Sequence, residues 1–308
     1  MTETTLYNQY VEDKKDKLSK ATIGNYTRLY NKIHNHFGVE KDEPANMEEA
    51  DLIMAINNDM VTNLGKKIEN PNTKTALFNT VVSVRKHFDL PITKLLKAKE
   101  NLLNPIYEHR ELVREQKSVA LPQYKDLRKH MINTFEREDY IGTIILGLID
   151  EFFTRNQDLD VYIVDSTKKA KDTDKNYLVV READMVYIKN KYKTSKTYGQ
   201  LKKKFKNKRV KKAIKEFLKT QPEGLQEYPL MVNSKGEKLD DTSQQKFIKR
   251  FTFKNLSESD YFKIRVNEFE KKSDMQGLLD ASKKRGTNLN TVVTNYSLKN
   301  IKAPNQNN

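Results

Sequence analysis

The spacing of apolar residues changes near residue 121, and this change limits the possible fold more than any other feature of the chain. Before it, apolar residues recur every three or four positions, as in residues 19–38, which predicts amphipathic helices. After it, residues 141–152 are apolar on nearly every helical face, which predicts a buried helix. Three short runs typical of β-strands follow, at 161–164, 177–180 and 185–188. We therefore expect a mainly α chain of the α+β class with a small three-stranded antiparallel sheet.

The length of 308 residues suggests two domains, each long enough to bury a core. In the first domain, Ser19 is suited to begin a helix and Gly38 is suited to end it. Further helices are expected at 47–56, 71–90 and 93–103. Residues 1–108 are thus expected to form a helical bundle.

The second domain is expected to begin where a charged stretch gives way to a new helical pattern. Residues 109–120 are expected to be a linker, and residues 121–308 to be the second domain. Pro122 is suited to the first position of a helix, where its missing N–H leaves no hydrogen bond unmade.

The composition excludes several kinds of site. Cysteine is absent, which excludes disulfides, cysteine nucleophiles and thiolate zinc sites. All five histidines lie in the first 130 residues, and no glycine motif for phosphate binding is present, so we expect no metal, cofactor or nucleotide. No window holds the ~18 uninterrupted apolar residues of a membrane helix, and the first residues differ from a secretory signal. We expect a soluble, intracellular protein without a membrane partner.

The net charge of +15 is concentrated in one window of 31 residues, 189–219. This window holds fourteen basic residues and one acidic residue, Glu216. Apolar and aromatic residues lie between the lysines, so we expect a folded segment with a basic surface, although a solvated lysine-rich helix face gives a similar pattern. A basic surface neutralises phosphates and binds polyanions with little sequence preference. The candidate DNA contacts are Lys189, Lys191, Lys196, Lys202, Lys203 and Lys204.

Four segments of the second domain carry residues suited to phosphoryl transfer without a metal, namely Arg155, Lys193, Arg265 and Tyr296. Arginines bind the non-bridging oxygens of a phosphate and stabilise charge in the transition state. A tyrosine hydroxyl can attack phosphorus and form a covalent phosphotyrosine, and a lysine on a turn can protonate the departing 5′ oxygen. Each residue alone also has an ordinary structural explanation, and Lys196 is an alternative to Lys193.

The order and spacing of these residues resemble the tyrosine recombinase family of the phage integrase type. The family pattern begins with Arg-x-x-Glu-Leu, and Arg155 is followed here by Asp158 and Leu159. The family then has a hairpin lysine often written Lys-Thr, which Lys193 and Thr194 match.

The last part of the family pattern is also present, with two departures. His-x-Leu-Arg is represented by the segment from Phe262 to Arg265, with phenylalanine in the histidine place. Gly-His is represented by Gly286 and Thr287, and Tyr296 follows nine residues after Thr287, as the family spacing requires.

The resemblance covers the chain end to end, because the opening Ser-x-x-Thr-x-x-x-Tyr from Ser19 resembles the family's core-binding domain. It implies a site-specific recombinase or integrase that cleaves and rejoins double-stranded DNA through a 3′-phosphotyrosyl intermediate. It also implies a free monomer that assembles into a tetramer on DNA, where the segment with Leu298 and Ile301 could dock on a neighbouring subunit. The catalytic residues implied are Arg155, Lys193, Arg265, Thr287 and Tyr296.

Both histidine positions of the family are vacant, because Phe262 and Thr287 occupy them. Thr287 can still donate a hydrogen bond, whereas the Phe262 side chain cannot. A slow enzyme is therefore expected, and a DNA-binding protein without catalysis is the alternative. A type IB topoisomerase, which uses the same residue types as a monomer, and an RNA-binding protein are further alternatives.

Overall fold

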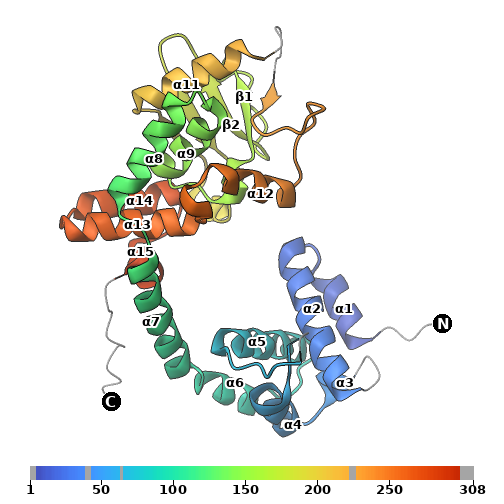
Figure 1. Ribbon diagram of the computed structural model, residues 1–308. Helices are drawn as coiled ribbons and strands as arrows, with labels where there is room; N and C mark the ends of the chain where they lie inside the picture. The colour runs from blue at the N-terminus through green and yellow to red at the C-terminus, as the bar shows by residue number, and fades with distance from the viewer. Residues whose placement is uncertain (1–4, 39–42, 63–64, 222–226, 299–308) are drawn as a thin grey trace. The chain divides into compact units, whose positions relative to one another are not determined.

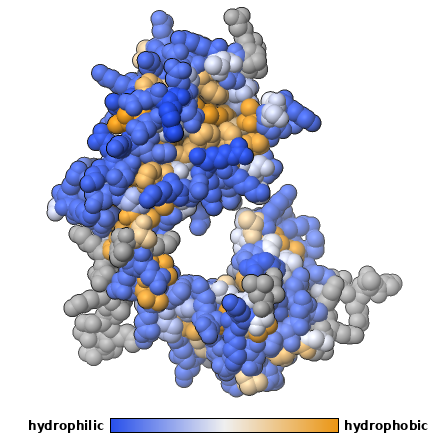
Figure 2. All heavy atoms as spheres, viewed as in Figure 1, coloured by the Kyte–Doolittle hydropathy of each residue, from blue (hydrophilic) through white to orange (hydrophobic). Residues whose placement is uncertain are grey.

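The computed structural model describes residues 5–38, 43–62, 65–221 and 227–298, so the expected docking residue Ile301 lies outside the described residues. The chain forms helices and one small mixed sheet, which confirms the mainly α, α+β class. It divides into two compact units between Arg114 and Glu115 (Figure 1). Figure 2 shows hydrophilic residues over most of the visible surface of each unit. Within the described ranges, no helix combines the length and apolar character needed to cross a membrane.

The N-terminal unit is helical. Ser19 and Gly38 bound its second helix as predicted: the Ser19 hydroxyl accepts a hydrogen bond from the N–H of Thr22, and Gly38 takes the left-handed conformation at φ 64°. The helices are α1 (Leu6–Lys14), α2 (Lys20–Phe37), α3 (Glu43–Asn46), α4 (Glu49–Met54), α5 (Pro71–His87) and α6 (Thr93–Glu100), with a π-helical turn η1 (Ala55–Asp59) after α4. The main core of this unit consists of Leu29, Ile33, Leu52, Leu77, Phe78, Val81 and their apolar neighbours.

One prediction at the start of the second domain is wrong, and it concerns Pro122. Helix α7 (Leu103–Ala120) runs through the whole of the expected linker, residues 109–120, and the boundary between the two units falls within it. Helix α8 (Tyr124–Glu136) begins after Gln123, and Pro122 therefore precedes the helix instead of occupying its first position. The start is fixed there because the Asp126 carboxylate accepts a hydrogen bond from the Gln123 N–H at 3.0 Å.

Helix α9 (Tyr140–Phe152) is the centre of the C-terminal unit and is buried on nearly every face, as predicted. Its Gly147 allows close approach of helix α11, since a Cβ atom at position 147 would lie 2.5 Å from the Val210 side chain of α11. The other helices are α10 (Ser195–Tyr198), α11 (Lys208–Lys219), α12 (Asp241–Phe251), α13 (Glu258–Lys271), α14 (Met275–Arg285) and α15 (Leu289–Tyr296), with 3-10 turns η2 (Asn156–Leu159) and η3 (Phe253–Asn255).

The sheet has five strands in the order β4-β3-β2-β1-β5, which corrects the prediction of three antiparallel strands. The three predicted strands are present, but β1 and β2 pair in parallel because the chain returns through the 165–175 connection before β2 begins. The other neighbouring pairs are antiparallel. The strands are β1 (Val161–Val164), β2 (Asn176–Val180), β3 (Met185–Lys189), β4 (Leu201–Lys204) and β5 (Tyr228–Pro229).

A separate apolar cluster joins the end of α9 to the last three helices. Phe153 packs here with Phe262 of α13, and Tyr296 of α15 is partly buried against the same cluster. The remaining buried members are Val266, Leu278, Ala281 and Val292. This cluster brings together three of the four segments that the sequence singled out for chemistry.

Candidate functional site

Arg155 lies directly after helix α9, where the chain makes a sharp turn. Phe153 ends the helix in the left-handed conformation at φ 53°, and Arg155 then precedes the 3-10 turn η2. The Arg155 N–H donates a hydrogen bond to Asp158 Oδ2 at 3.0 Å, and its Nη1 donates one to the carbonyl oxygen of Arg285 at 2.8 Å. The side chain of Arg155 keeps 15% of its surface exposed, so it can reach a ligand.

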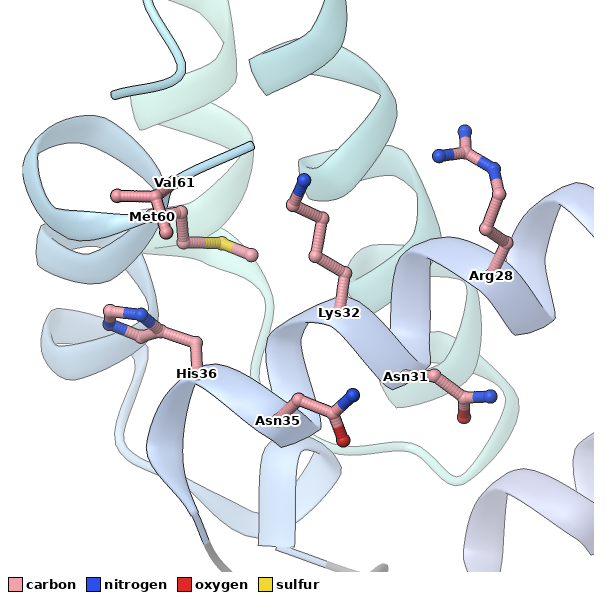
Figure 3. Close-up of a pocket in the computed structure, with 7 residues that line it drawn as sticks. All are labelled: Arg28, Asn31, Lys32, Asn35, His36, Met60 and Val61. Carbon is pink, nitrogen blue, oxygen red and sulfur yellow. The ribbon is translucent and has the colours of Figure 1, made fainter. Parts of the chain in front are cut away.

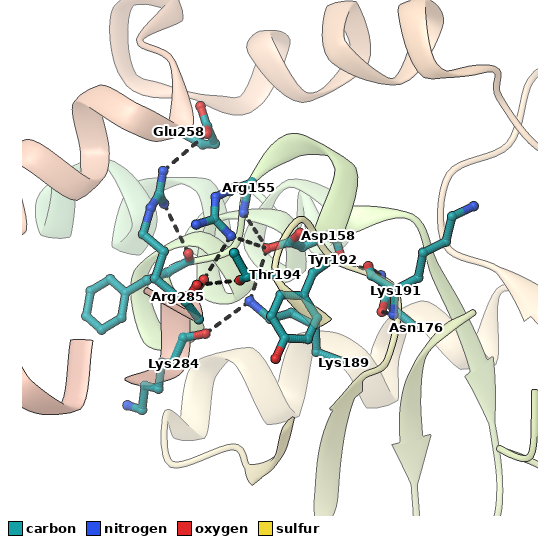
Figure 4. Close-up of polar contacts among 12 residues, drawn as sticks. Arg155, Asp158, Asn176, Lys189, Lys191, Tyr192, Thr194, Glu258, Lys284 and Arg285 are labelled. Atoms are coloured by element: carbon teal, nitrogen blue, oxygen red, sulfur yellow. Dashed lines mark hydrogen bonds and ion pairs between the residues drawn. The ribbon is translucent and has the colours of Figure 1, made fainter. Parts of the chain in front are cut away.

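Arg285 is the principal residue that the sequence did not reveal. It is the last residue of α14 and is only 1% exposed. Its Nη1 donates a hydrogen bond to the carbonyl oxygen of Phe153 at 3.1 Å, and its Nη2 lies 3.5 Å from Glu258 Oε1. Figure 4 shows Arg155, Asp158 and Arg285 converging from different segments. In the sequence, Arg285 follows two lysines in a last helical turn, where basic residues are common for reasons of helix stability alone.

The two arginines concentrate positive charge in a buried place. Burial lowers the pKa of Arg155, and the neighbouring Arg285 cation lowers it further, while Asp158 and Tyr296 act in the opposite direction. Arginine side chains carry a positive charge at neutral pH. A site in which two buried cations repel each other is stabilised by an incoming anion such as a phosphate.

Tyr296 ends α15 with its ring on the arginine cluster. The ring meets Phe262 edge-on, with centroids 4.7 Å apart, and lies 5.0 Å from the Arg285 guanidinium carbon. Within the described residues, no hydrogen bond is made to the Tyr296 hydroxyl. Phe262, in the place of the family histidine, is 1% exposed and therefore supports the tyrosine ring instead of offering a polar group.

Arg265 pairs with a carboxylate of α9, and within the described residues no hydrogen bond or ion pair joins its side chain to that of Arg155. Its Nε is 3.4 Å from Asp150 Oδ1, and its guanidinium stacks on Tyr124 at 4.0 Å. Asp150 also accepts a hydrogen bond from the Tyr124 hydroxyl at 3.1 Å. Burial raises the pKa of Asp150, and the Arg265 cation opposes that change. The partly buried Asp150 carboxylate explains the position of Arg265, because a charge removed from water needs a partner.

The hairpin between β3 and β4 carries the predicted Lys193. Its side chain is exposed and, within the described ranges, makes no ion pair. The next residue anchors the hairpin, since the Thr194 hydroxyl donates a hydrogen bond to the Gly286 carbonyl oxygen. Gly286 takes φ 65°, and a Cβ there would lie 2.4 Å from the Tyr192 ring. Lys193 is therefore the direct neighbour in sequence of Thr194, which contacts the turn that carries Thr287.

Thr287 lies between the arginine cluster and α15 and is partly buried. Its N–H donates a hydrogen bond to the carbonyl oxygen of Ser282 at 3.0 Å. Among the residues that the structure describes, its hydroxyl has no hydrogen-bond partner, so the hydroxyl is available to a ligand.

Lys189 is not a surface residue, which corrects its prediction as a DNA contact. Its side chain is 2% exposed, and its Nζ lies 3.1 Å from Asp158 Oδ2 and donates a hydrogen bond to the Lys284 carbonyl oxygen at 3.0 Å. Burial lowers the pKa of Lys189 to about 8, although Asp158 opposes that shift. Asp158 therefore connects this lysine to Arg155. The other predicted contacts are exposed: Lys191, Lys196, Lys202, Lys203 and Lys204.

The N-terminal unit has a polar pocket of about 400 Å³ along α2 (Figure 3). Arg28 and Lys32 project from one side of this helix, and His36 lies toward Met60. The remaining lining residues are Asn31, Asn35 and Val61. Cations and amides on one helix face are the groups that proteins use for phosphates and base edges.

Neither a protein-family model nor a curated protein sequence matches this chain. Among solved structures, a crystal structure of XerA recombinase is similar, with a TM-score of 0.39 and 14% sequence identity. The similarity covers 96% of this chain and 93% of that chain. A similarity of this size does not assign the chain to a family.

Proposed function

We propose that this protein is a DNA strand transferase of the tyrosine recombinase type, with Tyr296 as its nucleophile. One observation carries the proposal: Arg155, Arg285 and Tyr296 come from three separate segments and meet at one place. Such a place combines a partly exposed tyrosine with concentrated positive charge, as attack on a phosphodiester requires.

In the proposed reaction, the Tyr296 oxygen attacks phosphorus, the bond from phosphorus to the 5′ oxygen breaks, and a 3′-phosphotyrosine forms. The phenol proton leaves to solvent, and Lys193 gives a proton to the departing 5′ oxygen. Arg155 binds a non-bridging oxygen, and the Thr287 hydroxyl donates a hydrogen bond to the phosphate. Reversal with a second 5′ hydroxyl rejoins the strand. Arg265 receives a supporting role between α13 and α9, because it pairs with Asp150.

The proposed substrate is double-stranded DNA. The exposed lysines of the hairpin and β4 support this choice, and so do the cations and amides along α2. Strand exchange between two duplexes requires several active sites at once, so we also propose that free monomers assemble into a tetramer on DNA.

The decisive experiment uses a library of randomised duplexes, each with a nick that lets the 5′ product diffuse away after cleavage. The wild-type protein is expected to form a covalent adduct that survives denaturing electrophoresis, and sequencing of the attached DNA gives the target. Tyr296→Phe abolishes the adduct, whereas Tyr198→Phe, at an exposed tyrosine of the same domain, retains it. An adduct of equal yield in Tyr296→Phe contradicts the assignment of the nucleophile.

A DNA-binding protein without catalysis is the second candidate, and two observations favour it. Phe262 places a ring where a proton donor is expected, and Arg265 is paired with Asp150. This candidate predicts salt-sensitive DNA binding with no adduct for any member of the library. A type IB topoisomerase instead predicts an adduct together with relaxation of supercoiled plasmid by dilute monomer.

A further inference from the structure

We infer that Arg285 is a positioning residue that holds the nucleophile Tyr296 and the phosphate-binding Arg155 in one fixed geometry. The inference rests on the proposed function. It assigns a role to an arginine that lies outside the four-part sequence pattern, and it separates the role of the Arg285 backbone from that of its side chain.

The backbone of Arg285 fixes Arg155. Its carbonyl oxygen accepts a hydrogen bond from Arg155 Nη1 at 2.8 Å. This carbonyl belongs to the last turn of α14, where carbonyl groups lack partners within the helix and carry the negative end of the helix dipole. A cationic donor suits such a carbonyl, so the end of α14 orients the Arg155 guanidinium.

The side chain of Arg285 fixes Tyr296. The guanidinium carbon lies 4.3 Å from the Phe262 ring centroid and 5.0 Å from that of Tyr296, and the two rings are in edge contact with each other. These three groups contact one another in pairs, so none can move without disturbing the other two. The guanidinium is held in turn by the Phe153 carbonyl and Glu258.

The position of the charge gives Arg285 a second consequence for the proposed attack. Negative charge develops on the Tyr296 oxygen and ring as the phenol loses its proton, and a cation already beside the ring stabilises that charge without rearrangement. Phe262, in the histidine place, offers no charge of its own. Arg285 thus supplies positive charge beside the Tyr296 ring, whereas Phe262, at the vacant histidine position, supplies none.

The test compares Arg285→Met and Arg285→Lys with the wild-type protein, on a nicked duplex recovered from the library. Both variants keep the Arg285 carbonyl, so the hydrogen bond to Arg155 is preserved. Arg285→Met is expected to slow adduct formation by about 100-fold with DNA affinity within about 3-fold, and Arg285→Lys to recover part of the rate. Lys283→Met, at an exposed residue of the same helical turn, is the matched control and is expected to cleave at the wild-type rate.

Two chemical substitutions separate a positioning role from simple support of the fold. A more acidic difluorotyrosine at position 296 is expected to restore much of the lost rate in Arg285→Met, because the phenolate then needs less stabilisation. A substrate with sulfur in place of the 5′ oxygen, whose departure needs no proton, is expected to rescue Lys193→Met and not Arg285→Met. If Arg285→Met does not fold, Arg285→Lys carries both comparisons.

The outcomes distinguish this inference from the proposed function. If the wild-type adduct forms through Tyr296 but Arg285→Met cleaves normally, the inference is wrong and the proposed function stands. If difluorotyrosine gives Arg285→Met no rescue, Arg285 acts by geometry alone and the charge effect is wrong. If the wild-type protein forms no adduct through Tyr296, both are wrong.

Discussion

The Nζ of Lys189 lies 3.1 Å from Oδ2 of Asp158, and the two side chains are 2% and 0% exposed. Asp158 Oδ2 also accepts the Arg155 N–H, so one carboxylate oxygen serves a lysine of β3 and the residue proposed to bind phosphate. The ion pair thereby connects the central part of the sheet to the site.

Removal of the lysine is expected to destabilise the protein strongly. Lys189→Met removes the nearer cation from the buried Asp158 carboxylate and leaves only Arg155 Nη1, 4.0 Å away. Loss of one partner from a buried ion pair costs about 3–5 kcal/mol. Urea denaturation followed by circular dichroism measures the loss. Lys191→Met, at an exposed lysine two residues away, is the control and should change the free energy of unfolding by less than about 0.5 kcal/mol. Equal effects of the two substitutions would show that the pair contributes nothing.

The same lysine should give the stability of the protein a specific dependence on pH. The pKa of Lys189 is lowered from 10.5 to about 8, so the unfolded chain binds more protons than the folded chain between these values. The free energy of unfolding therefore rises with pH in this window, by at most about 1.4 kcal/mol per pH unit.

Comparison of the wild-type protein with Lys189→Met separates the contribution of Lys189 to the pH dependence of stability from that of the tyrosines, which titrate at higher pH. The difference in unfolding free energy between wild-type protein and variant should widen from pH 8 to pH 9.5. Parallel curves over that range would contradict the lowered pKa.

Gly286 is expected to tolerate alanine poorly. A Cβ at this position meets the Tyr192 ring at 2.4 Å, and φ is 65°. The left-handed conformation costs an alanine about 1–2 kcal/mol, and the crowding adds about 1–3 kcal/mol. Gly236→Ala, in the same unit, also has positive φ but meets nothing within 4 Å, so only the first cost applies. Thermal unfolding of the two variants measures the difference, and equal losses would show that the hairpin does not press on Gly286.

Arg265 and Asp150 should behave as a coupled pair. Each single substitution, Arg265→Gln or Asp150→Asn, leaves a partly buried charge without its partner. The double substitution is therefore expected to cost less than the sum of the single ones, by about 0.5–3 kcal/mol in unfolding free energy. Strict additivity would show that the two groups do not stabilise each other.

The exposed lysines should control how salt weakens the proposed binding to DNA. Replacement of Lys196, Lys202 and Lys203 by glutamine is expected to reduce the slope of log affinity against log salt by about 3, since each lost phosphate contact removes ~0.9. The triple arginine variant keeps the charge and should keep the slope. Fluorescence anisotropy at several salt concentrations measures both, and an unchanged slope in the glutamine variant would place the DNA elsewhere.

Features with a local cause could be predicted from the sequence. Ser19 and Gly38 carry their own capping chemistry, so the limits of α2 were predictable. The first three strands were also predictable, because β-branched and aromatic residues cluster there. β4 was not, because three of its four residues are exposed lysines, which give an edge strand no alternating apolar pattern.

The candidate site was harder to predict, because tertiary packing decides which charged residue is buried. Nothing local marks Lys189 as buried among many lysines, since its partner Asp158 lies 31 positions earlier in the chain. Arg285 is likewise indistinguishable in sequence from a basic residue at a helix end. Arg265 fits the family pattern, but its place also depends on Asp150, one of two adjacent carboxylates at the end of a mostly apolar helix.

The contact between Tyr192 and Gly286 has a consequence for timing in the proposed reaction. The hairpin that carries Lys193 rests directly on the turn between Arg285 and α15, so the hairpin cannot lift away without releasing that turn. Lys193, the proposed proton donor, and Tyr296, the proposed nucleophile, would then move into and out of their reactive positions together. Such coupling would protect the DNA, because a strand could not be cut while the group that completes the cut was still absent.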